Sequence, residues 1–451
     1  MEKSKNIILI GAGLVGSLLA CYLSRRGHRV YVFERRTDFR HTRYEGGRSI
    51  NLALSERGMR ALRYIGLMDR VQQLAIPMPG RLIHRGEESP FFQPYGQQGE
   101  SIFSVSRGQL NQLLVAEAEK NDQVNFYFGQ RCVAVDLQQQ IVTFADQASG
   151  EEYCVHGDVI LGTDGAFSEL RYAMQRQPGF NIHQVNEPYG YKELSIPAGS
   201  DGKHQLEMNA LHIWPRDSFM MIALPNLDGS FTNTLFAPFS GPYGLDSLKT
   251  TDDVRVFFQQ HFPTAYPLMT GLEEEFFSNP TSSLTTIRCF PWAKGKACLL
   301  GDSAHAIVPF YGQGMNCGFE DVYELNRLLD EYGDDWEGCL QAFQQIRKPN
   351  ADAILDLALY NYIEMRDLAG KDWFQLRLKM EKRIAQAFPD QFMTLYSMVT
   401  FSNIPYAEAQ ARANRQAALL DELMQWENIA ERWESEEVLQ RAGEWLTNNQ
   451  S

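Results

Sequence analysis

The fold is decided by residues 6–34, NIILIGAGLVGSLLACYLSRRGHRVYVFE. Asn6–Ile10 is a short apolar run that predicts a buried strand, and the apolar spacing from about Leu14 to Arg26 predicts a helix. Gly27 ends this helix, and Arg29–Glu34 predicts a second strand. A strand, a helix and a strand in this order form a βαβ unit with parallel strands.

The turn of this unit carries Gly11-x-Gly13-x-x-Gly16. The first glycine allows a tight turn, the second lets a pyrophosphate approach the backbone, and the third lets the helix pack closely on the strand. Glu34 ends the second strand, where a carboxylate can accept hydrogen bonds from ribose hydroxyls. The pattern predicts dinucleotide binding rather than a membrane span or signal peptide, because glycines interrupt the apolar run and a strand follows it.

Two later strand-and-turn signals identify the dinucleotide as FAD rather than NAD. Val159–Gly165 (VILGTDG) and Ala297–Asp302 (ACLLGD) are apolar runs that end in Gly and Asp, and a glycine-rich GQGMN follows at 312–316. Asp164 and Asp302 could hold ribitol hydroxyls, while a helix start offers backbone N–H groups to a flavin carbonyl. Each Asp taken alone is as well explained as a turn or helix cap.

The rest of the chain predicts two further regions. Phe219–Leu224 and Phe231–Phe236 flank a turn and predict a hairpin in an antiparallel sheet, and from about Cys339 the pattern is helical, with breaks at three prolines. We predict an α/β fold: a discontinuous Rossmann-like FAD-binding domain of the GR2 type, an inserted antiparallel β-sheet substrate domain and a helical C-terminal lobe. The expected boundaries are 1–75, 100–177 and 285–340 for the first, 76–99 and 178–284 for the second, and 341–451 for the third. The predicted breaks are Pro349, Pro389 and Pro405.

Composition narrows the function classes. The 451 residues carry 42 Lys and Arg against 56 Asp and Glu, a net charge of -14, which disfavours nucleic acid and anionic membranes as partners. The 7 Cys have no C-x-x-C spacing, which argues against a disulfide framework or a thiolate zinc site. We therefore expect a soluble protein of a reducing compartment, the cytoplasm, without a metal ion.

The chain resembles the class A FAD-dependent aromatic hydroxylases through GAGLVG, GTDG and GDSAHAIVPFYGQGMN. Over roughly residues 5–420 it is similar, more narrowly, to the kynurenine 3-monooxygenase family. The segments that carry this narrower resemblance are RSINLALS at 48–55, QPYG at 93–96, ALHIWP at 210–215 and NYIEM at 361–365. Members from eukaryotes end in a hydrophobic anchor; this chain ends in a polar helical stretch and resembles the soluble bacterial form.

The resemblance implies roles for two groups of residues. Those expected at FAD are Gly11, Gly13, Leu14, Gly16, Glu34, Arg35, Arg36, Leu52, Ala53, Arg107, Asp164, Asp302, Gly314, Met315 and Asn316. Those expected at the substrate are Arg81, Tyr95 and Tyr396 at its carboxylate, Asn361 and Glu364 nearby, and Leu211, Met220, Ile222, Leu224, Phe236, Pro309 and Phe310 around its ring. Met220, Ile222 and Leu224 also have the period of two that points one strand face into a pocket, although core packing explains that spacing equally well.

The implied activity is hydroxylation of L-kynurenine at ring carbon 3, with NADPH and O₂ as co-substrates, non-covalent FAD, and a flavin C4a-hydroperoxide that passes oxygen to the ring. The implied pathway is tryptophan catabolism toward NAD biosynthesis. The alternatives are a related hydroxylase of another aromatic acid, a flavin-linked halogenase or reductase, and a non-enzymatic flavoprotein. A homodimer stays open.

A few residues stand apart from these roles. Tyr311 occupies a position where the family has His or Phe, which leaves its role open. Arg377–Arg383 is rich in charge and predicts a solvated helix face, and Cys317 predicts a small buried thiol. His84, His204 and His212 lack the spacing of a metal triad.

Overall fold

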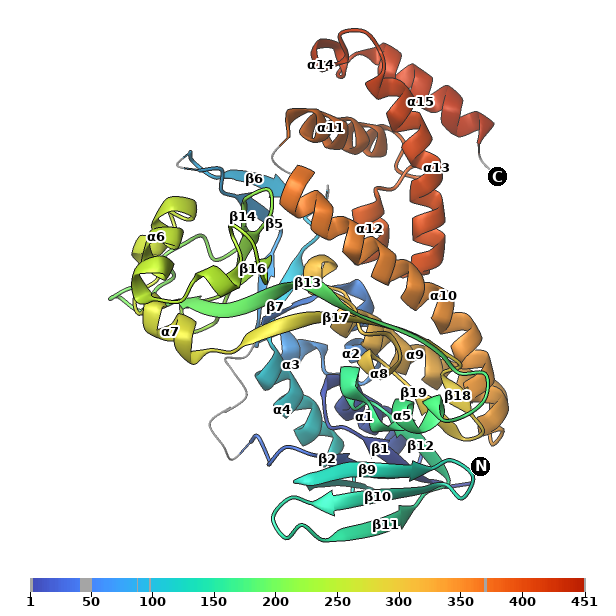
Figure 1. The fold of residues 1–451 in the computed structure, drawn as a ribbon. Helices are drawn as coiled ribbons and strands as arrows, with labels where there is room; N and C mark the ends of the chain where they lie inside the picture. Colours follow the sequence, from blue (N-terminus) through green and yellow to red (C-terminus); the bar gives the residue numbers. More distant parts are fainter. Residues whose placement is uncertain (1–2, 41–50, 87, 97–98, 369–370, 450–451) are drawn as a thin grey trace.

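The computed structural model describes residues 3–40, 51–86, 88–96, 99–368 and 371–449. The predicted βαβ unit is confirmed as β1 (Asn6–Ile10), α1 (Leu14–Arg25) and β2 (Arg29–Glu34). Strands β1 and β2 pair in parallel from Asn6 opposite Arg29 to Ile10 opposite Phe33. Figure 1 shows this unit in the lower half of the molecule, close to the N-terminus.

This unit lies in a six-stranded sheet in the order β18–β19–β12–β1–β2–β8. The sheet is parallel except for β18. Strand β1 is buried, α1 packs against it, and α4 and α9 pack on α1. The carboxyl ends of the sheet's parallel strands therefore share one edge, where ligands of such sheets bind. The other elements are β8 (Val124–Phe128), β12 (Val159–Gly162), β18 (Ala293–Lys294), β19 (Ala297–Leu299), α4 (Arg107–Ala118), α5 (Glu169–Gln175), α8 (Asp302–His305) and α9 (Gly314–Tyr332).

Two small antiparallel sheets flank the parallel one. One contains β9 (Gln130–Asp136), β10 (Ile141–Asp146) and β11 (Glu152–His156). The other contains β3 (Asn51–Leu54), β7 (Ile102–Ser106) and β4 (Ala75–Met78), with α2 (Glu56–Tyr64) and α3 (Met68–Gln72) between β3 and β4 in the chain.

A seven-stranded sheet, in the order β17–β13–β16–β15–β14–β5–β6, forms the middle layer. The predicted hairpin is confirmed, with Met220 of β15 opposite Phe236 of β16. Strands β14 and β5 pair in parallel, so the expected fully antiparallel sheet is wrong at this one pair, because β5 comes from a distant part of the chain. One face packs on α6 (Thr251–His261) and α7 (Leu272–Ser278), and the other packs on the C-terminal helices. The strands are β5 (Gly80–Ile83), β6 (Phe91–Pro94), β13 (Asn181–Ile196), β14 (Leu211–Pro215), β15 (Met220–Pro225), β16 (Phe231–Pro238) and β17 (Thr281–Phe290).

The C-terminal region is helical, as predicted, and Figure 1 shows it above the sheets. The expected break at Pro349 is wrong, because Pro349 lies inside one 28-residue helix, α10 (Trp336–Ile363). Residues such as Phe343 and Ile354 bury its apolar face on both sides of the proline, and this packing outweighs one lost hydrogen bond. Pro389 and Pro405 do separate helices: α11 (Asp372–Ala387), α12 (Leu395–Thr400), α13 (Tyr406–Met424), α14 (Ile429–Arg432) and α15 (Glu436–Asn448). A π-helical turn, Glu364–Leu368, extends α10.

We searched the described ranges for a helix that combines the length and the apolar character needed to cross a membrane, and found none.

Candidate active site

The three glycines after β1 have different surroundings. Gly11 has φ +104°, and a Cβ on it would lie 2.6 Å from the Thr163 carbonyl oxygen. A Cβ on Gly16 would lie 2.1 Å from the Gly11 carbonyl oxygen, whereas a Cβ on Gly13 would meet no atom of the described residues within 4 Å. The first and third glycines therefore serve the packing of β1, α1 and the loop after β12, and the second leaves open space at the start of α1. A pyrophosphate can approach the backbone there.

Glu34 lies at the end of β2 and is buried. One carboxylate oxygen accepts the backbone N–H of Ala12 at 3.0 Å, and the other accepts Nε of Arg36 at 2.8 Å. Burial alone would raise the pKa of Glu34, but the hydrogen bond and charge of Arg36 outweigh it and the pKa falls below its usual value. The carboxylate is thus ionised and fixed beside the glycine turn, while Arg35 is exposed and Leu14 is buried in α1.

The two aspartates that follow β12 and β19 have different environments. Both carboxylate oxygens of Asp164 are engaged by the protein, by Ser303 Oγ at 3.0 Å and by the Glu169 N–H at 2.8 Å. Asp302 begins α8, and its side chain remains accessible. Desolvation by the surrounding protein raises the pKa of Asp302, while the charges of Arg107 and His305 lower it. Of the two aspartates, Asp302 is therefore the one that is exposed.

The start of α9 is joined to β3 by one amide. Asn316 donates to the carbonyl oxygens of Ala53 at 2.8 Å and Gly312 at 2.9 Å, and accepts the Ser55 N–H at 2.9 Å. Within the described part of the chain, a Cβ on Gly314 would meet no atom within 4 Å. Leu52 and Ala53 of β3 and Gly314–Asn316 thus come together, with Met315 half-buried between the glycine and the amide. Open space at Gly13, Asp302 and Gly314 fits the extended shape of FAD.

Most of the residues expected around the substrate ring lie on one face of the seven-stranded sheet, in two clusters of buried side chains. The register places Arg81 of β5 beside Leu211 of β14, Ile222 of β15 beside Thr234 of β16, and Met220 beside Phe236. Phe310 closes this face, with its ring 4.9 Å from the ring of Phe236. Leu224 is buried at the end of the same strand, and Pro309 precedes Phe310 in a short 3₁₀ turn.

Arg81 lies beside a stacked pair of phenol rings at one end of these clusters. The rings of Tyr95, which follows β6, and Tyr396, in α12, stack at 5.0 Å with an interplanar angle of 11°. The guanidinium carbon of Arg81 lies 5.6 Å from each ring centre. Nε of Arg81 is buried and has no hydrogen-bond partner among the described residues. A half-buried arginine with an unpartnered N–H of this kind is ready to receive a carboxylate.

The neighbouring acidic residues include one that the sequence analysis missed. Burial raises the pKa of Glu364, and the charge of Arg81 lowers it. Burial, and then the charge of Glu364, raise the pKa of Glu381 in α11 to about 7. The side-chain amide of Asn361 donates to the Phe310 carbonyl oxygen at 2.7 Å. Asn361 therefore holds the loop that carries Phe310.

The expected solvated face at Arg377–Arg383 is wrong, since only Lys379 in this range is exposed. Met380 is fully buried, and Lys382 donates from Nζ to the Pro94 carbonyl oxygen at 2.8 Å, beside Tyr95. Charge alone could not reveal this, because the surfaces that cover the helix come from other segments, namely Pro94 and the later C-terminal helices.

The structure shows the surroundings of Tyr311. It is buried, and its ring stacks on that of Tyr396 at 5.8 Å. Burial, followed by the charge of Glu364, raises the pKa of Tyr311 well above its ordinary value, so its phenol stays neutral. Cys317 is fully buried, as predicted.

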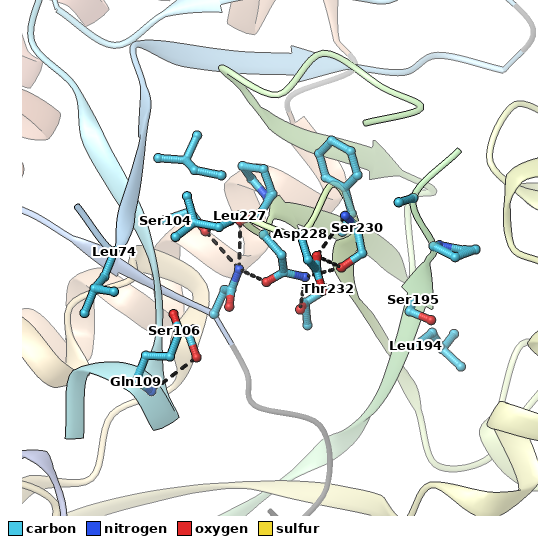
Figure 2. A pocket seen from close by; sticks show the side chains of 17 residues that line it. Leu74, Ser104, Ser106, Gln109, Leu194, Ser195, Leu227, Asp228, Ser230 and Thr232 are labelled. Carbon is cyan, nitrogen blue, oxygen red and sulfur yellow. Dashed lines mark hydrogen bonds between the residues drawn. The ribbon is translucent and has the colours of Figure 1, made fainter. Parts of the chain in front are cut away.

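A hollow of about 810 Å³ lies between β3 and β7 on one side and the β15–β16 hairpin on the other (Figure 2). Ser104, Ser106 and Gln109 line one side, and Leu227, Asp228 and Ser230 of the β15–β16 turn line the other. Asn51 joins the two sides by donating to Ser104 Oγ at 3.0 Å and to the Pro225 carbonyl oxygen at 2.9 Å. Its walls are hydroxyl- and amide-rich, a feature that the sequence did not reveal. Arg48–Ile50, the start of one quoted motif, lie outside the described residues.

Comparison with known proteins agrees with this geometry. Residues 4–358 match the model of a family described as "FAD binding domain". A kynurenine 3-monooxygenase of Christiangramia forsetii is 47% identical over 441 residues, 97% of this chain and 98% of its own. That of Myxococcus xanthus is 48% identical over 406 residues, 90% of this chain and 87% of its own. That of Sus scrofa is 42% identical over 412 residues, 90% and 86% of the two chains.

Solved structures share the fold. The tetrameric form of 2-methyl-3-hydroxypyridine-5-carboxylic acid oxygenase aligns with a TM-score of 0.67 at 23% identity, covering 81% of this chain and 94% of that one. PqsL of Pseudomonas aeruginosa, in complex with 2-aminobenzoylacetate, aligns with a TM-score of 0.66 at 19% identity, covering 81% and 97%. With a matched FAD-binding model over most of its length and near-complete relatives at almost half identity, the chain belongs to the kynurenine 3-monooxygenase family of FAD-dependent enzymes.

Proposed function

We propose that this protein hydroxylates L-kynurenine at ring carbon 3, with FAD as its cofactor and NADPH and O₂ as co-substrates. The observation that carries the proposal is the guanidinium of Arg81, which lies beside the stacked rings of Tyr95 and Tyr396 and whose buried Nε has no partner among the described residues. The family relationship supports the same substrate. The product is 3-hydroxy-L-kynurenine, in tryptophan breakdown toward NAD.

The two ends of L-kynurenine match the two ends of the proposed substrate site. Arg81 would pair both carboxylate oxygens through its planar fork, and the tyrosine hydroxyls would add hydrogen bonds. Glu364, with Glu381 behind it, would face the α-ammonium group. The aromatic ring would lie between Phe236 and Phe310, along with the aliphatic face of β14 and β15.

FAD, when bound, supplies the hydride acceptor and the oxygen-activating ring. Gly13 and Glu34 would hold its ADP half, Arg107 its phosphates and ribitol, and Asp302 its ribitol hydroxyls. Leu52 and Ala53 would lie beside the ring system, opposite Gly314–Asn316.

The remaining tasks belong to the protein. The aniline nitrogen of the substrate activates the neighbouring ring carbon, so the chain needs no strong base and must instead orient the ring and exclude water. Phe310 and Tyr311, both buried, would provide that exclusion.

The wider description follows from these parts. We propose the domain division expected from the sequence, and a soluble cytoplasmic enzyme whose partners are small molecules. A homodimer stays open. A hydroxylase of another aromatic acid would keep the flavin site and change the groups around Arg81, so substrate choice separates the two readings.

Flavin reduction tests the proposal. In a stopped-flow experiment without O₂, L-kynurenine should accelerate reduction of bound FAD by NADPH, because an occupied pocket positions the reacting groups. Anthranilate, which lacks the amino-acid side chain, serves as the control. Equal rates with and without L-kynurenine would count against the kynurenine assignment.

A further inference from the structure

Arg57 is a fully buried arginine in α2, three residues beyond β3. Its Nε donates to the Val399 carbonyl oxygen at 3.0 Å, and Nη2 donates to the Met398 carbonyl oxygen at 3.3 Å. Nη2 also donates to the Ile404 carbonyl oxygen. The first two acceptors belong to the last turn of α12, and the third lies in the loop that follows it. One guanidinium therefore closes the C-terminal end of α12.

The charge of Arg57 is balanced inside the protein. Nη1 pairs with Glu320 Oε1 at 2.6 Å, and the guanidinium lies 3.8 Å above the ring of Tyr406. Glu320 also pairs with Arg347 Nη1 of α10 at 2.6 Å. Breaking such a buried pair leaves an uncompensated charge, so the arrangement is rigid.

The same cluster reaches the loop before α9. Arg347 Nε pairs with Asp321 Oδ1 at 2.7 Å, and His305 Nε2 lies 2.6 Å from Asp321 Oδ2. His305, Cys317 and Asp321 offer ligand atoms within 4.8 Å of one another, but Arg347 already donates to Asp321 and to Cys317. The cluster is an internal ion network that joins the flavin-side loops to α10 and α12.

Helix α12 has only six residues, so most of its carbonyl groups cannot be satisfied within the helix. A cation at a helix C-terminus satisfies such groups and complements the helix dipole. Tyr396 lies in this helix, two residues before Met398, and stacks on Tyr95 beside Arg81. The orientation of Tyr396 therefore depends on what holds the end of α12.

We propose that Arg57 is a positioning residue for substrate recognition: it fixes α12 so that Tyr396 completes the carboxylate site, and thereby sets the preference for a substrate that keeps its carboxylate. This inference rests on the proposed function, since it assigns the Arg81 site to the amino-acid end of L-kynurenine. It goes beyond that function by placing part of the specificity in a side chain that does not touch the substrate.

A matched control lies one turn further along α2. Arg60 also approaches Glu320, at 3.4 Å, and pairs with Glu324 at 3.3 Å, with its guanidinium 4.1 Å from the ring of Tyr323. It shares the acidic partner of Arg57 but makes no described contact with α12. Comparing Arg57→Lys with Arg60→Lys therefore isolates the link to α12.

The experiment measures discrimination between two ligands on the FAD-loaded enzyme. One is L-kynurenine, and the other is kynuramine, the amine that remains when kynurenine loses its carboxylate. Dissociation constants come from the change in flavin absorbance, and KM and kcat come from product formation. Arg57→Lys should weaken the binding of L-kynurenine at least about fivefold and the binding of kynuramine less than about twofold. Arg60→Lys should leave the ratio of the two dissociation constants as in the wild type.

A second variant avoids dependence on a buried charge. Ser402 is half-buried and donates from Oγ to the Met398 carbonyl at 2.6 Å, so Ser402→Ala loosens the same helix end without unpairing an ion. Like Arg57→Lys, this variant should lower the preference for L-kynurenine over kynuramine, by about twofold. In a Tyr396→Ala background, Arg57→Lys and Ser402→Ala should cause no further loss of discrimination.

Two results would overturn the inference. One is an equal weakening of both ligands by Arg57→Lys and Ser402→Ala, with a lower melting temperature, which would make the link merely structural. The other is unchanged discrimination in both variants. If the wild-type enzyme itself fails to prefer L-kynurenine, the proposed function fails along with this inference, so the wild-type measurement tells the two failures apart.

Discussion

At the scale of single residues, Arg81 carries the proposed recognition. We expect Arg81→Lys to raise the KM for L-kynurenine tenfold or more, because lysine keeps the charge but loses the planar fork; tenfold corresponds to about 1.4 kcal/mol. Steady-state kinetics measures this, and FAD content should stay normal. Arg85→Lys is the control, since Arg85 lies on the same segment but stacks on Phe91 at 4.8 Å. A wild-type KM in Arg81→Lys would remove Arg81 from the site.

Glu34 makes a second residue-scale prediction. Glu34→Gln should raise the dissociation constant of FAD roughly tenfold or more while the fold persists, since a hydrogen bond to a charged group is worth about 1.5–3 kcal/mol. Titration of apoprotein with FAD measures it. Asp38→Asn is a matched control, because Asp38 binds Arg40 through the same i, i+2 contacts that Glu34 makes with Arg36. Equal FAD affinity in wild type and Glu34→Gln would refute the assignment.

Glu381 predicts a pH dependence. Its pKa is raised from 4.5 to about 7 in the folded protein. Below pH 4.5 the carboxyl group is protonated in both the folded and the unfolded protein, so it does not lower the free energy of unfolding. As pH rises to 7 the unfolded chain releases the proton first, and stability is lost; above 7 the loss is complete. Glu381→Gln should therefore raise the melting temperature at pH 8 and change it little at pH 5. A shift that is the same at both pH values would contradict the assignment.

At the scale of elements, two glycines of the turn after β1 should affect different properties: Gly16 the stability of the fold, and Gly13 the binding of FAD. In Gly16→Ala the new Cβ would lie 2.1 Å from a backbone oxygen, so the β1–α1 packing must shift and the melting temperature should fall by several degrees or more. In Gly13→Ala the new Cβ meets no atom of the described ranges within 4 Å, so the apoprotein should melt near the wild-type temperature but bind FAD at least about tenfold more weakly. Calorimetry and FAD titration measure the pair. Normal FAD affinity in Gly13→Ala would move the pyrophosphate elsewhere.

Secondary-structure elements could be predicted from the sequence where the apolar spacing and the turn residues of one short segment indicate the same element. The unit β1–α1–β2 and the β15–β16 hairpin follow from periodicity and turn residues, and the structure confirms both. The state of Pro349 and of the charged segment Arg377–Arg383 is decided by packing, which the residue types alone do not show. Phe343 and Ile354, on either side of the proline, bury α10 in the core, and Lys382 donates to the Pro94 carbonyl oxygen.

At the scale of the whole molecule, the site is assembled from segments far apart in the chain. Arg81 comes from β5, Tyr396 from α12 and Phe310 from the loop before α9, and the ion network of Arg57, Glu320 and Arg347 holds three of the supporting helices together. Spacing alone could place the FAD turns, because each is a contiguous motif. It could not place the substrate residues, whose grouping was expected only from family resemblance, nor Glu381, Arg57 or the hollow of Figure 2.

One measurement tests the central claim most directly: product analysis of purified, FAD-loaded enzyme incubated with NADPH, O₂ and L-kynurenine. The account predicts 3-hydroxy-L-kynurenine in nearly equal amount to the NADPH consumed, with little hydrogen peroxide. It predicts slow NADPH consumption when L-kynurenine is left out. NADPH oxidation that L-kynurenine does not change, or that yields hydrogen peroxide without hydroxylated product, would contradict the account.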